Sequence, residues 1–286
     1  MNRLVLFLAT NLAVVTVLTL VLTLLGLNRP GASLLPFLLS ATLIGVGGSF
    51  ISLLMSKSMA TRATGAQVIA SPTSQIERWL VETVRRQAEK AGIGMPEVAV
   101  FESATPNAFA TGADRNHALV AVSTGLLRHM REDEVEAVLG HEISHVANGD
   151  MVTLTLIQGV VNTFVMVFAS VLAGALDRDN REGQRGMGYY AGYMVAQAVL
   201  GFLASIVVCW FSRQREFRAD AGGAALAGRE RMIAALERLQ IAHDPGHLPE
   251  GMASFGISGN MLGGIGHLFA THPPLAARIE ALRRAG

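Results

Sequence analysis

The residues best suited to chemistry lie in the stretch AVLGHEISHVANGD, residues 137 to 150. His141 and His145 are four positions apart, so on a helix they project from one face and can offer two imidazoles to a single metal ion. Glu142 stands beside them as a candidate general base. This spacing predicts an H-E-x-x-H zinc site, although a surface helix with two solvated histidines would carry the same letters.

A catalytic zinc needs a third protein ligand and keeps its fourth position for water. The segment SRQREFRADAGG, residues 212 to 223, offers Glu216 and Asp220, again four apart on a helical face. It begins where one apolar run ends, and HEISH lies just before another, so a helical hairpin through a membrane would bring Glu216 level with the histidines. The alternative for Glu216 is an exposed carboxylate that pairs with Arg213 or Arg218.

The composition is that of a membrane protein. Of the 286 residues, 51% are hydrophobic and 16% are charged, and the mean hydropathy is +0.40, which is too apolar for an ordinary soluble domain. The net charge of +1 comes with no basic cluster, which argues against nucleic-acid binding. The single cysteine, Cys209, excludes an intrachain disulfide and a cysteine-rich zinc site.

Long runs without Asp, Glu, Lys or Arg predict the membrane spans. A spanning helix needs about 20 apolar residues, and an N-terminal signal peptide has a much shorter apolar region than the first run here. We therefore predict two transmembrane helices within residues 1–55 and two within residues 151–211. The four predicted spans are residues 4–27, 34–55, 151–176 and 187–211.

Two polar parts remain, residues 56–150 and residues 212–286. Two predicted crossings separate them, so both must lie on the same side of the membrane. Lys and Arg are more frequent next to the spans on this side than on the other, a bias typical of the cytoplasmic side. We expect both polar parts and both termini in the cytoplasm.

Helix boundaries in the first polar part can be predicted from capping residues. Ser74 and Glu77 form a capping box, and Gly92 follows the apolar pattern of the helix that they begin. The HEISH helix should begin at the acidic residues 132–134, which suit the positive end of the helix dipole, and end at Gly149.

A small β-sheet is predicted between these two helices. Residues 97–103 and 118–123 are rich in strand-forming residues, and the Gly/Asn-rich segment between them predicts a hairpin with a long loop. Asn107 in this segment is a candidate for a strand edge that pairs with an extended substrate, or a turn asparagine. His272, in THPP, is a candidate oxyanion donor, or only the residue before a helix.

Four motifs, PNAFATG, GHEISHVANGD, REFRADAGG and THPPLAARI, are interleaved with two pairs of apolar segments. Together they resemble the HtpX-type heat-shock proteases of the M48 family, membrane zinc metalloproteases related to the CAAX-processing Ste24 proteases. The resemblance covers essentially the whole chain. It implies a mainly α membrane protein, with four transmembrane helices and a cytosolic α+β zincin-like metalloprotease domain that contains a small β-sheet.

The resemblance also implies one Zn²⁺ per chain, held by His141, His145 and Glu216, with Glu142 as the general base. Asp220 would accept the free N–H of a zinc-bound imidazole; an ordinary salt bridge to Arg215 or Arg218 is its alternative. The implied activity is cleavage of damaged or misassembled membrane proteins during stress. The implied location is the bacterial inner membrane, with the active site facing the cytosol.

Two other classes of protein compete with this interpretation. A catalytically silent zinc-binding scaffold or chaperone would keep the metal but would not need Glu142. A transporter is disfavoured because the predicted spans contain no acidic or basic residue that could form an ion path. Self-cleavage is also expected, because the Gly-rich segment 251–267 resembles a loop that an active site on the same chain could reach.

Overall fold

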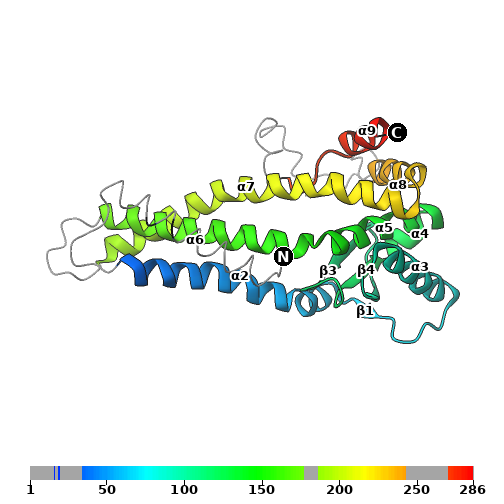
Figure 1. The fold of residues 1–286 in the computed structure, drawn as a ribbon, viewed down its shortest axis with the longest axis horizontal. Coiled ribbons are helices and arrows are strands. Elements are labelled where there is room, and N and C mark those ends of the chain that lie inside the picture. The colour runs from blue at the N-terminus through cyan, green and yellow to red at the C-terminus, as the bar shows by residue number, and fades with distance from the viewer. Residues whose placement is uncertain (1–15, 17–18, 20–33, 177–185, 243–269, 286) are drawn as a thin grey trace. The chain divides into compact units, whose positions relative to one another are not determined.

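The computed structural model describes most of the chain, namely residues 16, 19, 34–176, 186–242 and 270–285. The chain divides into two compact units. The first unit contains residues 1–52 and 153–208, and the second contains residues 53–152 and 209–286. Three long helices, labelled in Figure 1, have residues in both units: α2 (Leu34–Thr64), α6 (Asp150–Leu176) and α7 (Met187–Ala227).

These three helices are long and apolar enough to cross a membrane. They correspond to three of the predicted spans, and the predicted span at residues 4–27, apart from residues 16 and 19, lies outside the described residues. The helices α2 and α7 continue past the ends of their apolar runs, to Thr64 and Ala227. Consequently, the polar residues that follow the apolar part of α7 belong to the same continuous helix.

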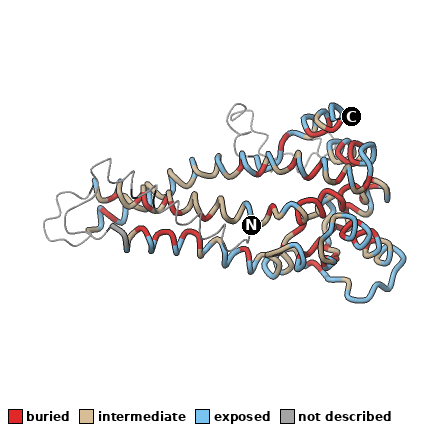
Figure 2. Tube along the Cα trace, in the orientation of Figure 1, coloured by how far each residue is buried: buried red, intermediate tan, exposed pale blue. Residues whose placement is uncertain are grey.

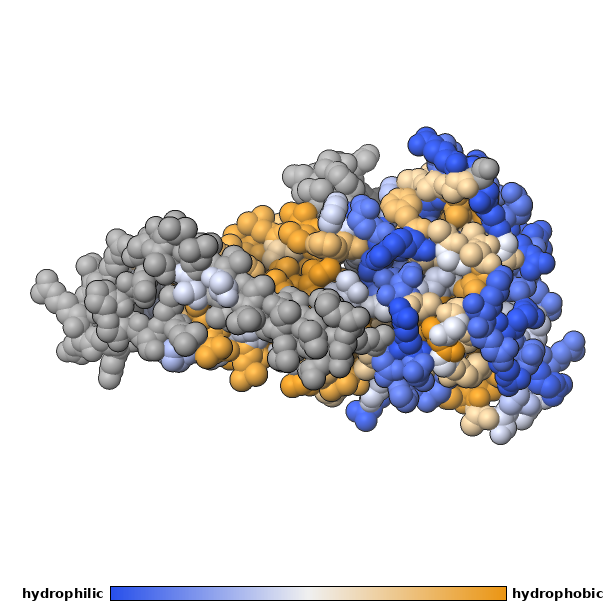
Figure 3. Space-filling model, in the orientation of Figure 1, coloured by the Kyte–Doolittle hydropathy of each residue, from blue (hydrophilic) through white to orange (hydrophobic). Residues whose placement is uncertain are grey.

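Within the first unit, α2 and α6 approach closely at small residues. A Cβ atom added to Gly45 would lie 2.5 Å from Thr163 Oγ1, and one added to Gly159 would lie 3.0 Å from the Val46 Cα atom. Small residues of this kind let transmembrane helices pack with their backbones close together. Helices α2 and α7 both expose large apolar side chains, such as Leu43 and Phe202. Figure 3 shows apolar surface, in orange, on the part of the molecule that contains the long helices.

The second unit contains a four-stranded sheet with the order β1-β2-β4-β3. Strands β2 and β4 are parallel, whereas β1 pairs antiparallel with β2, and β3 pairs antiparallel with β4. The predicted hairpin of β2 and β4 was therefore wrong, because the segment between them contains β3 and carries the chain across the sheet. The strands are β1 (Gln67–Val68), β2 (Glu97–Phe101), β3 (Ala108–Thr111) and β4 (Leu119–Ser123).

The main core of the second unit lies between the sheet and the helices (Figure 2). Every residue of β4 is buried, as expected for a central strand that is covered on both faces. Leu139 and Ile143 of the HEISH helix are completely buried in this core, so the helix is fixed along its apolar side. The helices of this unit are α3 (Gln75–Ala91), α4 (Thr124–His129), α5 (Glu132–Asn148), α8 (Arg229–Ala242) and α9 (Leu275–Arg284).

The predicted helix boundaries are confirmed. Ser74 Oγ accepts from the Glu77 backbone N–H at 3.1 Å, and Glu77 in turn accepts from the Ser74 N–H. Gly92 ends α3 with φ 66°, and Gly149 ends α5 with φ 70°. These left-handed conformations are accessible to glycine at little cost, which explains why each helix ends where it does.

Candidate metal centre

The HEISH sequence lies in the last two turns of α5, where His141 and His145 are on the same face. Both side chains are buried, and their Nε2 atoms are 3.1 Å apart. Two ring nitrogens at this distance cannot both be protonated without repulsion. The pair is therefore arranged to share a single cation.

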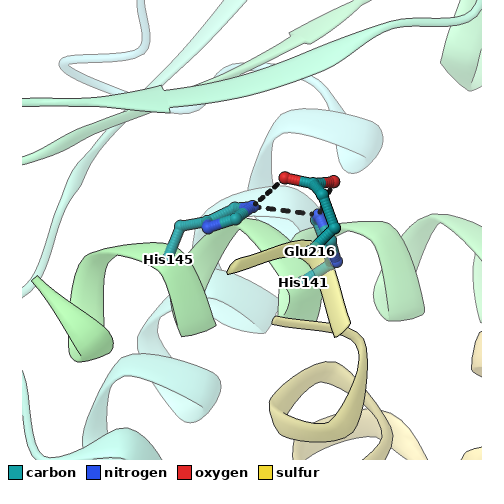
Figure 4. Close-up of side chains that lie close together, drawn as sticks. All are labelled: His141, His145 and Glu216. Atoms are coloured by element: carbon teal, nitrogen blue, oxygen red, sulfur yellow. Dashed lines mark hydrogen bonds and ion pairs between the residues drawn. The ribbon is translucent and has the colours of Figure 1, made fainter. Parts of the chain in front are cut away.

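Glu216 reaches the same point from α7 (Figure 4). One carboxylate oxygen is 3.3 Å from His145 Nε2, and the other is 3.6 Å from His141 Nε2. The three side chains are buried and offer ligand atoms that all lie within 4.8 Å of one another. Although Glu216 is far from the histidines in the sequence, the polar part of α7 brings its carboxylate to them.

Glycines allow α7 to lie directly against α5. A Cβ atom on Gly223 would be 3.0 Å from the His141 backbone nitrogen, and one on Gly140 would be 3.3 Å from the Gly223 carbonyl oxygen. A Cβ on Gly222 would collide with Ser144. The glycines after Asp220 therefore set the separation that brings the carboxylate of Glu216 within reach of the imidazoles.

Each site histidine has its own carboxylate partner on the other ring nitrogen. His141 Nδ1 is 2.9 Å from Asp220 Oδ1, and His145 Nδ1 is 2.7 Å from Asp150 Oδ2. A carboxylate at Nδ1 holds the proton on that nitrogen, so the lone pair of Nε2 remains available. Both Nε2 atoms face Glu216.

Arg278 of α9 completes the buried cluster. Its guanidinium donates two hydrogen bonds to Asp220, at 2.8 and 2.6 Å, and lies 3.4 Å from a Glu216 oxygen. This bidentate contact fixes the carboxylate of Asp220 opposite His141. Sequence reasoning did not single out Arg278 or Asp150, although both lie within motifs that carried the resemblance.

The charges at this centre fit a divalent cation. Asp150, Glu216 and Asp220 are each 1% exposed. Among the described residues at the centre, Arg278 is the buried group that is permanently positive. Three carboxylates and one guanidinium leave an excess of two negative charges when the histidines are neutral, and buried charge is costly unless it is compensated. Two imidazoles and a carboxylate are also ligands that zinc favours.

The surroundings favour positive charge on the imidazoles as well. Burial lowers the pKa of His145, but the hydrogen bonds to Asp150 and Glu216 outweigh it and raise the pKa from 6.5 to about 9. Burial also opposes charge on His141, and the bonds to Asp220 and Glu216 again raise its pKa. In the metal-free protein, the carboxylates thus favour a protonated imidazole at the position where a cation would bind.

The other predicted site residues occupy different positions. Glu142 is half-buried on α5, and no hydrogen bond or ion pair within the described part of the chain holds its carboxylate. His272 is next to the centre, with Nδ1 at 2.7 Å from a Glu216 oxygen and a side chain that is 64% exposed. Asn107 lies just before β3, and its side chain is exposed.

The backbone of Asn107 is already paired within the sheet. Its N–H donates to Ser123 Oγ, and its carbonyl accepts from the Ser123 N–H, both at 2.9 Å. Its peptide groups therefore face β4 and not the open edge of β3, the edge that pairs with no strand among the described residues. Because the direction of pairing alternates along an antiparallel strand, the peptide groups of Ala108 and Ala110 face that edge.

Comparisons with known proteins identify the family of the chain. The model of peptidase family M48 matches residues 74–285. The chain is 59% identical over 285 residues to the protein named Protease HtpX of Xanthomonas campestris pv. campestris (strain B100), covering 99% of this chain and 97% of that one. It is 60% identical over 287 residues to the Protease HtpX of Xanthomonas axonopodis pv. citri (strain 306), covering 99% and 98%.

The fold also resembles the crystal structure of S. mikatae Ste24p, with a TM-score of 0.64 and 18% sequence identity. The similarity covers 86% of this chain and 58% of that chain. The resemblance stated from the sequence motifs is thereby confirmed. The chain belongs to peptidase family M48 and is a membrane-associated metalloprotease.

Proposed function

We propose that this protein is a zinc-dependent endopeptidase that cleaves damaged or misassembled proteins of the bacterial inner membrane, as part of a stress response. The observation that carries the proposal is the meeting of His141, His145 and Glu216 within 4.8 Å of one another. These residues would hold one zinc ion per chain. When bound, zinc would acidify a water molecule and polarise a peptide carbonyl.

Glu142 is the proposed general base. It is the neighbour of the ligand His141 in the sequence and keeps partial access to solvent, whereas Glu216 is 1% exposed and bonded to three histidines. A carboxylate that is not held by a hydrogen bond can accept the proton of the attacking water and pass it to the leaving amine. Glu142 would thus act as the general base, whereas Glu216 would bind the metal.

Asp220 is the proposed orienting residue for His141. It accepts from His141 Nδ1 and is itself fixed by Arg278. This arrangement supports the interpretation of Asp220 as a partner of a metal ligand. Its salt bridge is with Arg278, and not with Arg215 or Arg218 as the alternative from the sequence had it. Such a partner raises the basicity of the ligand and fixes its orientation.

Substrate binding is proposed at the open edge of β3. An extended peptide could add to this edge as a further strand, using the outward peptide groups of Ala108 and Ala110. Asn107 would then contribute through its exposed side chain at the beginning of the edge. Substrates in this extended form are peptide segments outside a transmembrane helix, where backbone hydrogen bonds are not already satisfied.

His272 is the proposed donor to the developing oxyanion. Its ring is mostly exposed, and its Nδ1 contacts Glu216, so its Nε2 is the atom available to a substrate oxygen.

Residues 56–150 and 212–286 are proposed to lie together in the cytoplasm, because α6 and α7 would supply two crossings between them. Self-cleavage within the Gly-rich segment 251–267 is part of this proposal.

Replacement of Glu142 by Gln tests the activity against a silent zinc-binding scaffold. The amide cannot accept the proton of water, so cleavage of a membrane-protein substrate should fall by at least about 100-fold. Zinc content should stay near that of the unmodified protein, because Glu142 is not a proposed ligand. Both are measured on purified full-length protein, by gel assay of the substrate and by metal analysis.

A chelator control separates the two interpretations further. Cleavage by the unmodified protein should stop with a chelator and return when zinc is added. Undiminished proteolysis by Glu142→Gln would show that Glu142 is not the general base. Zinc binding by the unmodified protein without any cleavage would favour the scaffold.

A further inference from the structure

Asp150 is a buried carboxylate at the metal centre that the proposed mechanism has not used. It is the first residue of α6 and follows Gly149, whose φ of 70° ends α5. Its side chain is 1% exposed, and Oδ2 is 2.7 Å from His145 Nδ1. The change of direction at Gly149 therefore turns the next side chain back toward the histidine of the preceding turn.

The position of Asp150 is also fixed from α7, the helix that carries Glu216. Arg215 Nη1 donates to the Asp150 backbone carbonyl at 3.1 Å, and Arg218 Nη2 is 3.6 Å from Asp150 Oδ1. Arg215 is itself held by a 3.0 Å bond from Nη2 to Ser212 Oγ. The carboxylate is thus held between the helix of the two histidines and the helix of the third proposed ligand.

We propose that Asp150 is a positioning residue for His145. Its carboxylate accepts the Nδ1–H of the imidazole, which fixes the tautomer and directs the Nε2 lone pair toward the metal. Asp220 has the equivalent relation to His141, so each imidazole ligand has one carboxylate behind it. This inference rests on the proposed function, because it requires His145 to bind the metal.

The main test is the zinc affinity of purified full-length Asp150→Ala, measured by competition with a chromogenic chelator. Loss of a partner behind a metal ligand typically weakens binding by about 10–100-fold, and that loss is expected here. Asp150→Asn should fall between Ala and the unmodified protein, because its amide oxygen can still accept from Nδ1. The zinc affinity should therefore be highest in the unmodified protein, intermediate in Asp150→Asn and lowest in Asp150→Ala.

Asp114→Ala is a matched control. Asp114 Oδ2 is 2.8 Å from His117 Nδ1, so this substitution also removes a carboxylate from an imidazole, but on an exposed pair of the same unit. It should leave zinc affinity within about twofold of the original. A change at Asp150 alone then reports on the metal centre and not on carboxylates in general.

The tautomer provides a readout that a purely structural role would not move. In zinc-loaded protein labelled with ¹⁵N-histidine, His145 should show a Nδ1–H signal that is protected from exchange. Asp150→Ala should lose this signal, and Asp220→Ala should lose that of His141 instead. If Asp150→Ala does not fold, the same signal and affinity are measured in Asp150→Asn, for which a weakened affinity with the Nδ1–H retained is expected.

The outcomes separate this inference from the proposed function. Affinity within about twofold of the original in both Asp150 variants, or a protected His145 Nδ1–H that persists in Asp150→Ala, would overturn the role of Asp150 while leaving the metal centre in place. Failure of the unmodified protein to bind zinc would instead overturn the metal centre, and this inference with it.

Discussion

Glu216 contacts both site histidines, and its substitution is therefore the most direct test of the ligand set. Glu216→Ala should lose zinc nearly as completely as His141→Ala, because each removes one of three protein ligands. Asp220→Ala should weaken binding only by about 10–100-fold, as expected for a partner of a ligand. Metal analysis after gel filtration measures both, and equal zinc content in Glu216→Ala and the unmodified protein would place the third ligand elsewhere.

The protonation of His145 predicts a pH dependence of metal binding. Burial lowers the pKa of His145 in the metal-free protein, but the hydrogen bonds to Asp150 and Glu216 outweigh burial and raise the pKa from 6.5 to about 9. Zinc binds the neutral imidazole, so below about pH 9 it must displace a proton from His145. The zinc affinity should therefore rise about tenfold per pH unit for each proton displaced. A histidine with an ordinary pKa would give a plateau soon above pH 6.5.

Competition titrations between about pH 7 and about pH 8.5 check this prediction. A continuing increase in affinity over that interval is expected. A constant affinity above about pH 7 would mean that the carboxylates do not raise the pKa of His145 above its ordinary value. Glu216 should add no pH dependence in this interval, because burial raises its pKa but the hydrogen bonds to the histidines outweigh burial and lower the pKa, so that Glu216 is already deprotonated throughout.

The residues of the centre differ in how well they could be predicted from the sequence. His141, Glu142 and His145 were predicted from spacing, and Glu216 from its position after an apolar run. Asp150 was not, because its approach to His145 depends on the backbone turn at Gly149. Arg278 was not either, because its contact with Asp220 joins two helices that are far apart in the chain. Fixed spacing within one helix can be read from the sequence, whereas a contact between elements can be predicted only where another feature constrains it, as the apolar run did for Glu216.

At the level of elements, the close packing of α5 and α7 depends on glycine. A Cβ on Gly222 would collide with the Oγ of Ser144 and lie 2.8 Å from its Cβ atom. Rotation of the hydroxyl can relieve only the first contact, so the helices must move apart. Gly222→Ala should lower the free energy of unfolding by about 1–3 kcal/mol and weaken zinc binding, because Glu216 lies on the displaced helix.

Gly201→Ala is the control within the same helix. A Cβ at Gly201 meets none of the described atoms within 4 Å, and alanine favours a helix over glycine by about 1 kcal/mol. This variant should keep or slightly raise its thermal midpoint and should keep its zinc affinity. Equal behaviour of the two variants, measured by thermal unfolding in detergent and by chelator competition, would show that the α5–α7 distance is not limited by Gly222.

The sheet shows where element prediction from sequence failed. Four residues, Ala108–Thr111, form β3 inside a segment whose Gly, Asn and Asp content indicated a loop. A strand this short leaves little periodic signal between turn residues. Its presence changes the topology, because β4 pairs with both β2 and β3. The helices were predicted better, since capping residues such as Ser74 and Gly149 mark their ends directly.

For the whole molecule, the central question is the side of the membrane on which each part lies. The candidate spans α6 and α7 would separate residues 53–152 from residues 209–286 by two crossings, so the ligands from α5 and α7 would lie on one side. The excess of Lys and Arg beside these parts favours the cytoplasm. The short segment between α6 and α7 should then be outside.

Cysteine labelling tests this topology in spheroplasts. After Cys209→Ser removes the single cysteine, one cysteine is introduced in place of Ser71, Arg115, Gly31 or Glu182. A membrane-impermeant maleimide should label positions 31 and 182 in intact spheroplasts, but positions 71 and 115, which are exposed on the second unit, only after permeabilisation. If positions 115 and 182 were both protected until permeabilisation, α6 and α7 would not cross the membrane as a hairpin. The explanation of how His141, His145 and Glu216 reach the same side of the membrane would then be wrong, even though their geometry within the second unit would stand.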